Sequence, residues 1–311
     1  MLDCLIVGGG PAGLNAALYL VRFKRTVVLV DDDNSRVRWI PESRNISLFG
    51  EGIAGQEILR RGRTAIEGYS VRSSSGKVTL LARAGDGFRV EITNTNGEVH
   101  EQFSRFVLLA SGAEDTAPEM PDAEGAVRAG LLRYCPVCDG FEASDRRVAV
   151  LGRGSHGTKE AEFLVRSGFN DVTLLSFREA LDVTAGERQN LAAAAVHLIT
   201  EPAQKLRRRG PELVASTASG ELVFGTVYAA LGLKPRCGLA RRLGAACDGS
   251  GALLVNDHFE TSVPGLYAAG DVVSGLSQIV VAMGHAAVAS TAIHNALGLP
   301  ATRAKPIRSR A

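Results

Sequence analysis

Two cysteines enclose a two-residue spacer in the segment Cys135-Pro136-Val137-Cys138. Thiols at this spacing can close a small disulfide ring, and they suit redox cycling when a helix start stabilises a thiolate. The pair can instead supply half of a zinc site, but structural zinc needs four ligands, usually with a second close pair. No second close pair and no histidine pair at zinc spacing is found, so a redox dithiol without a metal is favoured. The remaining cysteines are expected to be inert: Cys4, Cys237 and Cys247.

An acidic residue, Asp139, follows the second thiol directly. A carboxyl group at this position can pass a proton during thiol–disulfide exchange. It can equally cap the short helix that the dithiol would begin. The candidate catalytic residues are therefore Cys135, Cys138 and Asp139, with both roles open for the acid.

A glycine-rich turn, Gly8 to Gly13, follows an apolar run near the N-terminus. Gly8 permits a tight turn, Gly10 lets the backbone approach a pyrophosphate, and Gly13 allows close packing of helix on strand. The helix after the turn would present its partially positive N-terminus to the phosphates. Asp31 ends the next apolar run, near the spacing at which an acid accepts hydrogen bonds from a ribose. Together these features predict a dinucleotide site.

Two further segments repeat parts of this pattern. Residues 152–157 form a second glycine turn after an apolar run and before a helix, which predicts a second βαβ unit. His156 within it is interpreted as a turn residue. Gly270-Asp271 ends an apolar run ahead of a long apolar helix, on which His285 is interpreted as a packed histidine.

The elements that must position these residues follow from hydrophobic periodicity. Short apolar runs predict buried strands, and two alternating stretches, 77–106 and 206–227, predict β-meanders. The fold class is therefore α/β, with two Rossmann-like three-layer ββα nucleotide-binding domains, the second inserted in the first. The predicted ranges are 1–116 for the first part of the outer domain, 117–243 for the inserted domain, and 244–311 for the second part.

Length and composition restrict the classes of protein to which the chain can belong. The 311 residues include 45% hydrophobic and 22% charged residues, which is ordinary for a folded protein of two domains. The net charge of +2 gives no reason to expect a nucleic-acid or membrane partner. We see neither a signal peptide nor an apolar run of about 18 residues, so no membrane span is expected. The odd cysteine count fits a cytoplasmic location, where thiols stay reduced.

Together these motifs resemble the low-molecular-weight thioredoxin reductases of bacteria, which are FAD-dependent pyridine nucleotide-disulfide oxidoreductases of class II. The resemblance covers the chain from Gly8 to about Leu297 and includes the strand end at Ser111-Gly112-Ala113. It implies that the outer ranges hold FAD and that the inserted range is NAD(P)H-binding-like and carries the dithiol. Trp39 would lie near the flavin. The implied FAD residues are Gly8, Gly10, Pro11, Ala12, Gly13, Asp31, Arg36, Asn45, Ser111, Gly112, Gly270, Asp271, Gln278 and Ile279.

The resemblance also implies roles for the dithiol. Cys138 would face the flavin, Cys135 would attack the substrate disulfide, and Asp139 would be the acid–base group. Members of the family are homodimers that rotate the inserted domain between two states. One state brings nicotinamide to the flavin, and the other brings the dithiol to it and frees it for thioredoxin.

The sequence departs from the family where NADPH should bind. The candidate NADPH residues are Gly152, Gly154, Gly157 and Arg178. Family members usually end the second strand of the inserted domain with His-Arg-Arg, whereas Leu175 here precedes Ser-Phe-Arg-Glu, so one arginine remains. The glycine turn carries the bulky Arg153 and His156, and Ser277 stands where the family commonly has arginine. NADPH is therefore a doubtful donor.

Three functions remain open on the sequence. The first is a thioredoxin reductase-like flavoprotein that passes electrons through FAD to the dithiol and on to a thioredoxin-like disulfide, with NADPH or another reductant such as ferredoxin as donor. A side branch of the family keeps FAD and the dithiol without using pyridine nucleotide. It suggests the second function, an FAD-dependent dithiol oxidase that acts on a small-molecule or protein dithiol and passes electrons to oxygen. The third is a non-enzymatic flavin and dithiol redox sensor.

Overall fold

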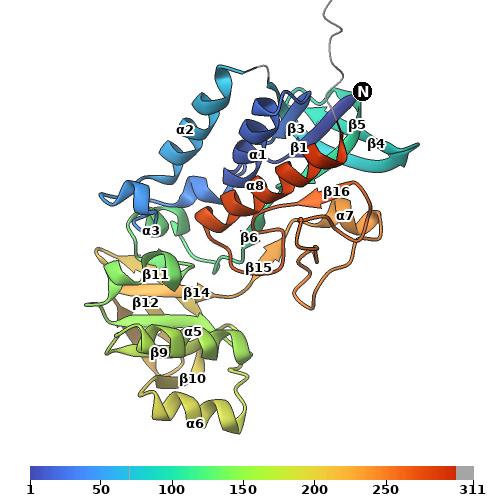
Figure 1. Ribbon diagram of the computed structural model, residues 1–311. Coiled ribbons are helices and arrows are strands. Elements are labelled where there is room, and N and C mark those ends of the chain that lie inside the picture. The colour runs from blue at the N-terminus through green and yellow to red at the C-terminus, as the bar shows by residue number, and fades with distance from the viewer. Residues whose placement is uncertain (70, 299–311) are drawn as a thin grey trace, which may run out of the picture. The chain divides into compact units, whose positions relative to one another are not determined.

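The computed structural model describes residues 1–69 and 71–298, so the end of the predicted third range, 299–311, lies outside the described residues. The chain divides into two compact units, each described here by itself (Figure 1). The first unit comprises Met1–Arg36, Ile58–Ala113 and the chain from Pro235 onward. The second comprises Val37–Glu57 and Glu114–Lys234. The cofactor domains predicted at 1–116, 117–243 and 244–311 stay predictions.

The first unit is built on a mixed sheet that combines parallel and antiparallel strand pairs. Parallel pairing joins β1 (Leu2–Val7) to β2 (Val27–Asp31) and to β5 (Val99–Leu109), and β5 to β16 (Leu266–Ala268). The start of β3 (Arg72–Ala84) pairs parallel with β2, and its remainder forms an antiparallel meander with β4 (Gly87–Asn94) and the start of β5. The predicted meander is confirmed.

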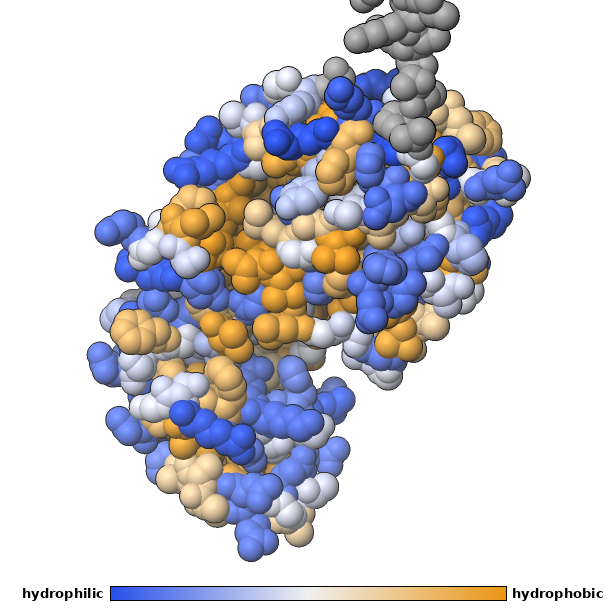
Figure 2. Space-filling view, viewed as in Figure 1, coloured by the Kyte–Doolittle hydropathy of each residue, from blue (hydrophilic) through white to orange (hydrophobic). Residues whose placement is uncertain are grey.

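Helices α1 (Pro11–Arg22) and α8 (Ile279–Ala296) lie side by side in this unit and pack on its parallel strands (Figure 1). Apolar side chains gather on the surface over these helices, where Val280 and Met283 are exposed (Figure 2). By length and composition α8 meets the criterion for a membrane span, although no span is expected from the apolar runs of the sequence. One such helix, packed along α1 and β16, is weak evidence for a span.

The second unit has a parallel sheet in the order β10-β9-β8-β14-β7. Side chains alternate along its central strands: Val148 and Val150 of β8 face the core under α5, whereas Ala149 and Leu151 face the meander core. The unit is therefore three-layered, and the predicted α/β fold class is confirmed. The sheet strands are β7 (Leu132–Arg133), β8 (Val148–Gly152), β9 (Val172–Phe177), β10 (His197–Ala203) and β14 (Thr226–Ala230). The meander strands are β11 (Lys205–Arg209), β12 (Glu212–Thr217) and β13 (Gly220–Phe224).

The remaining elements are short or lie at the edges of the units. The helices are α2 (Gly55–Glu67), α3 (Ala123–Arg128), α4 (Pro136–Asp139), α5 (Gly154–Arg166), α6 (Ala185–Ala193) and α7 (Gly238–Arg242). The strands β6 (Ala113–Asp115) and β15 (Leu233–Pro235) pair with each other.

Candidate active site

The first glycine turn is packed too tightly for any side chain at two of its positions. A Cβ on Gly13 would lie 1.8 Å from the carbonyl oxygen of Gly8. Gly8 has φ +104°, and a Cβ there would lie 2.4 Å from the carbonyl oxygen of Ala110. These glycines bring the start of α1 directly onto β1, as the motif predicts.

The helix start after this turn is open to a negatively charged group. Gly10 is the N-cap of α1, and among the described residues no side chain caps the first turn. Pro11, at the first helical position, has no N–H to satisfy. The remaining first-turn N–H groups can therefore meet phosphate oxygens.

Asp31 braces the turn from the end of β2. Its carboxylate accepts a hydrogen bond from the N–H of Gly9 at 3.0 Å and pairs with Arg63 of α2 at 3.3 Å. Arg63 also pairs with Asp33 at 2.6 Å. Sequence reasoning missed Arg63, because a single arginine on an amphipathic helix carries no signal of the acid that it meets. The predicted ribose contact of Asp31 stays a prediction.

Other predicted FAD residues are brought together in the same unit. Arg36 and Asp271 form an ion pair at 3.3 Å, with both side chains mostly buried. Gly270 has φ +80°, and a Cβ there would lie 3.2 Å from the Cβ of Ala12, so the second motif packs on the first. Ser111 donates a hydrogen bond at 2.8 Å to the carbonyl oxygen of Arg236.

The backbone of Arg236 fixes the same strand end, because its N–H donates to the carbonyl oxygen of Gly112 at 2.9 Å. Gln278 is the N-cap of α8 and Ile279 is its first residue. Asn45 is placed apart from this set, in the segment that groups with the second unit, where it accepts a hydrogen bond from Ser43. Trp39 lies in that segment too and is partly exposed.

The first unit fits FAD by its own geometry. The turn leaves backbone rather than side chains at the helix start, as a pyrophosphate requires. On α8, the Nδ1 atom of His285 is buried and lacks a hydrogen-bond partner among the described residues. Its ring packs on Phe259 with centroids 4.3 Å apart, so the predicted packed histidine is confirmed. The residues that would hold FAD are those gathered around Gly10 and Asp271.

The dithiol lies at the start of a helix, as predicted. Cys135 is the N-cap of α4, Pro136 is its first residue, and the two cysteines are joined in a disulfide. The N–H of Cys138 donates to the carbonyl oxygen of Cys135 at 3.0 Å, which holds the ring closed along the backbone. Both cysteines are half-buried, as an exchange centre requires.

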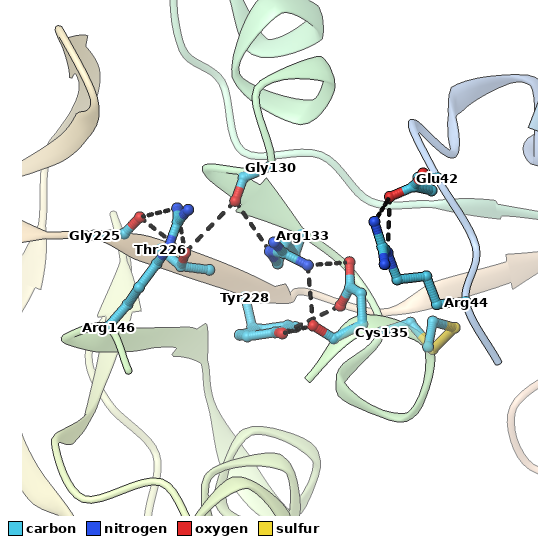
Figure 3. A network of polar contacts seen from close by, with 11 residues as sticks. Glu42, Arg44, Gly130, Arg133, Cys135, Arg146, Gly225, Thr226 and Tyr228 are labelled. Carbon is cyan, nitrogen blue, oxygen red and sulfur yellow. Dashed lines mark hydrogen bonds and ion pairs between the residues drawn. A yellow bond between two sulfur atoms is a disulfide. The ribbon is translucent and has the colours of Figure 1, made fainter. Parts of the chain in front are cut away.

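Asp139, the residue after the dithiol, is held by the side chains of Arg133 and Tyr228 (Figure 3). Arg133 pairs with one carboxylate oxygen at 2.8 Å, and the hydroxyl of Tyr228 donates to the other at 3.1 Å. Burial raises the pKa of Asp139, and Arg133 and Tyr228 oppose that rise. The carboxylate therefore binds an arginine and a tyrosine rather than capping α4.

The three cysteines outside the dithiol lie in the first unit and are free. Cys4 is fully buried in β1, and burial raises the pKa of its thiol. Burial likewise raises the pKa of the Cys247 thiol, and the neighbouring Cys237 adds to the rise. A raised pKa disfavours the reactive thiolate, which supports the interpretation of Cys4 and Cys247 as inert.

In the second glycine turn, backbone groups pack against and hydrogen-bond to other parts of the same unit. Gly152 and Gly157 pack closely, since a Cβ on Gly157 would lie 2.8 Å from the carbonyl carbon of Gly152. The N–H of Gly154 donates at 2.7 Å to the carbonyl oxygen of Asp182. His156 lies within α5 rather than in the turn, so its interpretation as a turn residue is wrong.

The two arginines nearest to this turn both have acidic partners. Arg178, the one candidate for gripping a 2′-phosphate, pairs with Glu119 and lies over the ring of Phe177. Arg153 pairs with Glu179. The carboxylates offset the positive charge that a phosphate would need, so the residues present fit NADPH poorly.

Comparison with known proteins places the chain among relatives of the same architecture. Residues 2–286 match the pyridine nucleotide-disulphide oxidoreductase family. The solved structure of HlmI is 30% identical with a TM-score of 0.84, over 95% of this chain and 92% of that one. Thioredoxin reductase from Streptococcus pyogenes MGAS5005 is 27% identical with a TM-score of 0.85, over 96% of this chain and 98% of that one.

A curated relative extends the comparison to longer proteins. A component of alkyl hydroperoxide reductase in Staphylococcus aureus (strain Mu50) is 27% identical over 93% of this chain and 57% of its own length. The chain thus spans little more than half of the curated relatives that it matches first. The chain therefore belongs to the pyridine nucleotide-disulphide oxidoreductase family and combines a thioredoxin reductase-like fold with a Cys135–Cys138 disulfide.

Proposed function

We propose that the protein passes electrons through FAD to the Cys135–Cys138 pair and on to the disulfide of a thioredoxin-like protein. The observation that carries this proposal is the disulfide at the start of α4, followed directly by the partly buried Asp139, which Arg133 and Tyr228 hold. FAD supplies the two-electron redox chemistry when bound. On the family resemblance we also propose a cytoplasmic homodimer that uses NADPH or another reductant such as ferredoxin.

The chain's own residues carry out the exchange in this proposal. One thiolate of the reduced pair, assigned to Cys135, attacks a sulfur of the substrate disulfide and forms a mixed disulfide. Cys138 then attacks Cys135, which closes the ring and releases the second substrate thiol, so one disulfide is reduced and one is formed. Asp139 holds the proton that the leaving thiolate takes up, and Arg133 and Tyr228 orient its carboxyl group.

A second candidate is a dithiol oxidase that runs the exchange in reverse and passes electrons to oxygen. The pairing of Arg153 and Arg178 with glutamates favours it, because the nucleotide-binding turn then has little free positive charge. The dithiol and its acid would act on the substrate as before, with the proton moving in the opposite direction.

One anaerobic titration separates the two. The purified yellow protein is mixed with excess NADPH, then NADH, then dithiothreitol, and the flavin absorbance is followed. Rapid bleaching with a nucleotide supports the NADPH- or NADH-dependent reductase. Bleaching with dithiothreitol alone removes the nucleotide-dependent form and supports the oxidase.

The dithiol assignment has its own test. Cys138→Ser should abolish disulfide turnover, a loss of more than about a hundredfold, while FAD stays bound. Cys247→Ser, which changes a free cysteine of the other unit, is the matched control and should keep full turnover. Turnover retained in Cys138→Ser would refute the proposed function whatever the donor.

A further inference from the structure

A small cavity adjoins the dithiol within the second unit. Its volume is about 220 Å³, and one wall is made by Pro136 and Val137, the two residues between the cysteines. The opposite wall is one face of α5, to which residues three, four and seven apart contribute. We call it the α4–α5 pocket, and its lining residues are Pro136, Val137, His156, Lys159, Glu160 and Phe163.

The size of the pocket restricts what can enter it. Pockets for drug-sized ligands measure roughly 300–1,000 Å³. A cavity of about 220 Å³ therefore takes a compact molecule and is too small for a whole dinucleotide. Its place against the bridge between the cysteines suits a molecule that must react with them.

The lining combines an apolar wall with charged groups. Val137 and Phe163 are 45% and 41% exposed, so each offers apolar surface that no other part of the described chain covers. Lys159 is exposed at the same cavity and supplies a positive charge. Such a site favours a ligand with a short hydrocarbon body and a negatively charged end.

Glu160 adds a hydrogen-bonding group of unusual character. Its side chain is 12% exposed, and its Oε1 atom has no hydrogen-bond partner among the described residues. Burial, together with Asp115, raises the pKa of Glu160 to about 7, so a large share carries a proton at neutral pH. A protonated carboxyl group donates a hydrogen bond, and a ligand carboxylate can accept it.

We propose that the α4–α5 pocket binds a low-molecular-weight disulfide that carries a carboxylate and presents its sulfur–sulfur bond to the neighbouring dithiol. The proposal rests on the disulfide exchange proposed above and names its substrate class. In the step, the reduced dithiol gives two electrons to the small disulfide. The substrate S–S bond breaks, the Cys135–Cys138 bond forms, and the two protons of the dithiol leave with two small thiols.

Three symmetric disulfides of similar length test the charge preference. Dithiodipropionate carries two carboxylates, hydroxyethyl disulfide is neutral, and cystamine carries two amines. The enzyme is first reduced with dithiothreitol and freed of it, so the measurement does not depend on the physiological donor. The rate constant for thiol release should be about tenfold higher with dithiodipropionate than with cystamine, with the neutral disulfide between them.

A charge reversal at Lys159 tests whether the preference for negatively charged disulfides arises in the α4–α5 pocket. Lys159→Glu should reverse the order of dithiodipropionate and cystamine. Lys205→Glu, an exposed lysine of the same unit on β11, is the matched control and should leave the order unchanged. Equal rates with all three disulfides, or an unaltered order in Lys159→Glu, would overturn the pocket while leaving the dithiol function in place.

Two further outcomes are distinguishable. Competitive inhibition of dithiodipropionate by nicotinamide mononucleotide would assign the pocket to a nucleotide and overturn the proposal. Failure of the reduced enzyme to react with any small disulfide or with a thioredoxin disulfide would instead remove the proposed exchange function itself.

Discussion

The two glycine turns have the same glycine spacing, and they differ in which backbone N–H groups remain available to a ligand. At the first, Asp31 at the end of β2 accepts the N–H of Gly9, and the start of α1 has no capping side chain among the described residues. At the second, no side chain caps α5 among the described residues either, but the N–H of Gly154 is bonded to the carbonyl oxygen of Asp182, and the N-cap residue Arg153 pairs with Glu179. In the first turn, Asp31 holds the backbone at Gly9 and the N–H groups at the start of α1 remain available to a ligand. In the second turn, the N–H of Gly154 is already hydrogen-bonded within its own loop.

The difference shows that a βαβ unit can keep its shape while the requirements of its ligand change. In both turns glycines allow the helix to approach the strand, at Gly13 in the first and at Gly157 in the second. Close packing is needed for the fold in either case. The positions that face a ligand are under a separate constraint, and there the second turn carries Arg153, whose charge is offset by Glu179.

The largest effect is expected at Gly13. In Gly13→Ala the new Cβ would meet the carbonyl oxygen of Gly8 at 1.8 Å, and neither backbone can move without opening the turn. We expect a cost of about 3 kcal/mol or more and loss of bound FAD. The ratio of flavin absorbance to protein absorbance after purification measures it.

A contrasting change in the second turn is Gly154→Ala, at the position that corresponds to Gly10 of the first turn. Its Cβ would meet nothing closer than a carbonyl oxygen at 3.9 Å, so only the left-handed φ of +57° opposes it. The expected cost is about 1 kcal/mol, and flavin content should be unchanged. Loss of FAD in both variants, or in neither, would break the contrast between the turns.

A second prediction concerns the acids of the two units. Asp31 is paired and hydrogen-bonded, whereas Glu160 of α5 is buried with one oxygen lacking a partner among the described residues. Asp115 raises the pKa of Glu160 further, and His156, Lys159 and Tyr228 also face it. The pKa of Glu160 rises from 4.5 to about 7 on folding. Its favourable contribution to the free energy of unfolding is therefore fully present below pH 4.5 and is lost as the pH rises through 7.

Glu160→Gln removes this dependence. At pH 8 the variant should exceed the parent in free energy of unfolding by about 3 kcal/mol, and near pH 4.5 the gain should vanish. Thermal unfolding at the two pH values measures the difference. Glu162→Gln on the same helix, where Arg166 pairs with the carboxylate, is the control and should show no gain at pH 8. A gain that is equal at both pH values would mean that titration of Glu160 is not its cause.

Local patterns were enough to predict the fold and the dithiol, because each depends on neighbours in the chain. The apolar run at Val148 to Leu151 and the glycines of both turns are of this kind. The support of Asp139 could not be predicted. Tyr228 lies 89 residues away on β14, where a buried tyrosine hydroxyl signals that a partner exists without identifying it.

The ion-pair partners of charged residues could not be predicted from the sequence either. The pairing of Arg178 with Glu119 joins positions 59 apart, and no periodicity links them. The pairing of Arg63 with Asp31 is of the same kind. Sequence comparison detected the missing arginine of the NADPH site, but only the structure places an acid against the arginine that remains.

The smallest effect is expected from releasing that arginine. Glu119→Gln removes the carboxylate that pairs with Arg178, which leaves the guanidinium able to meet a 2′-phosphate. The pair is exposed, and exposed pairs contribute at most about 1 kcal/mol, so affinity for NADPH should rise no more than about fivefold. Affinity for NADH should stay constant, because it lacks the phosphate.

Titration of each nucleotide by its own fluorescence measures both affinities without relying on turnover. Glu124→Gln, which removes the partner of Arg128 on α3, is the control and should change neither affinity. If the unaltered protein already binds NADPH much more tightly than NADH, and Glu119→Gln changes nothing, then Arg178 is not restrained by its partner. In that case the second turn would be as open to its nucleotide as the first.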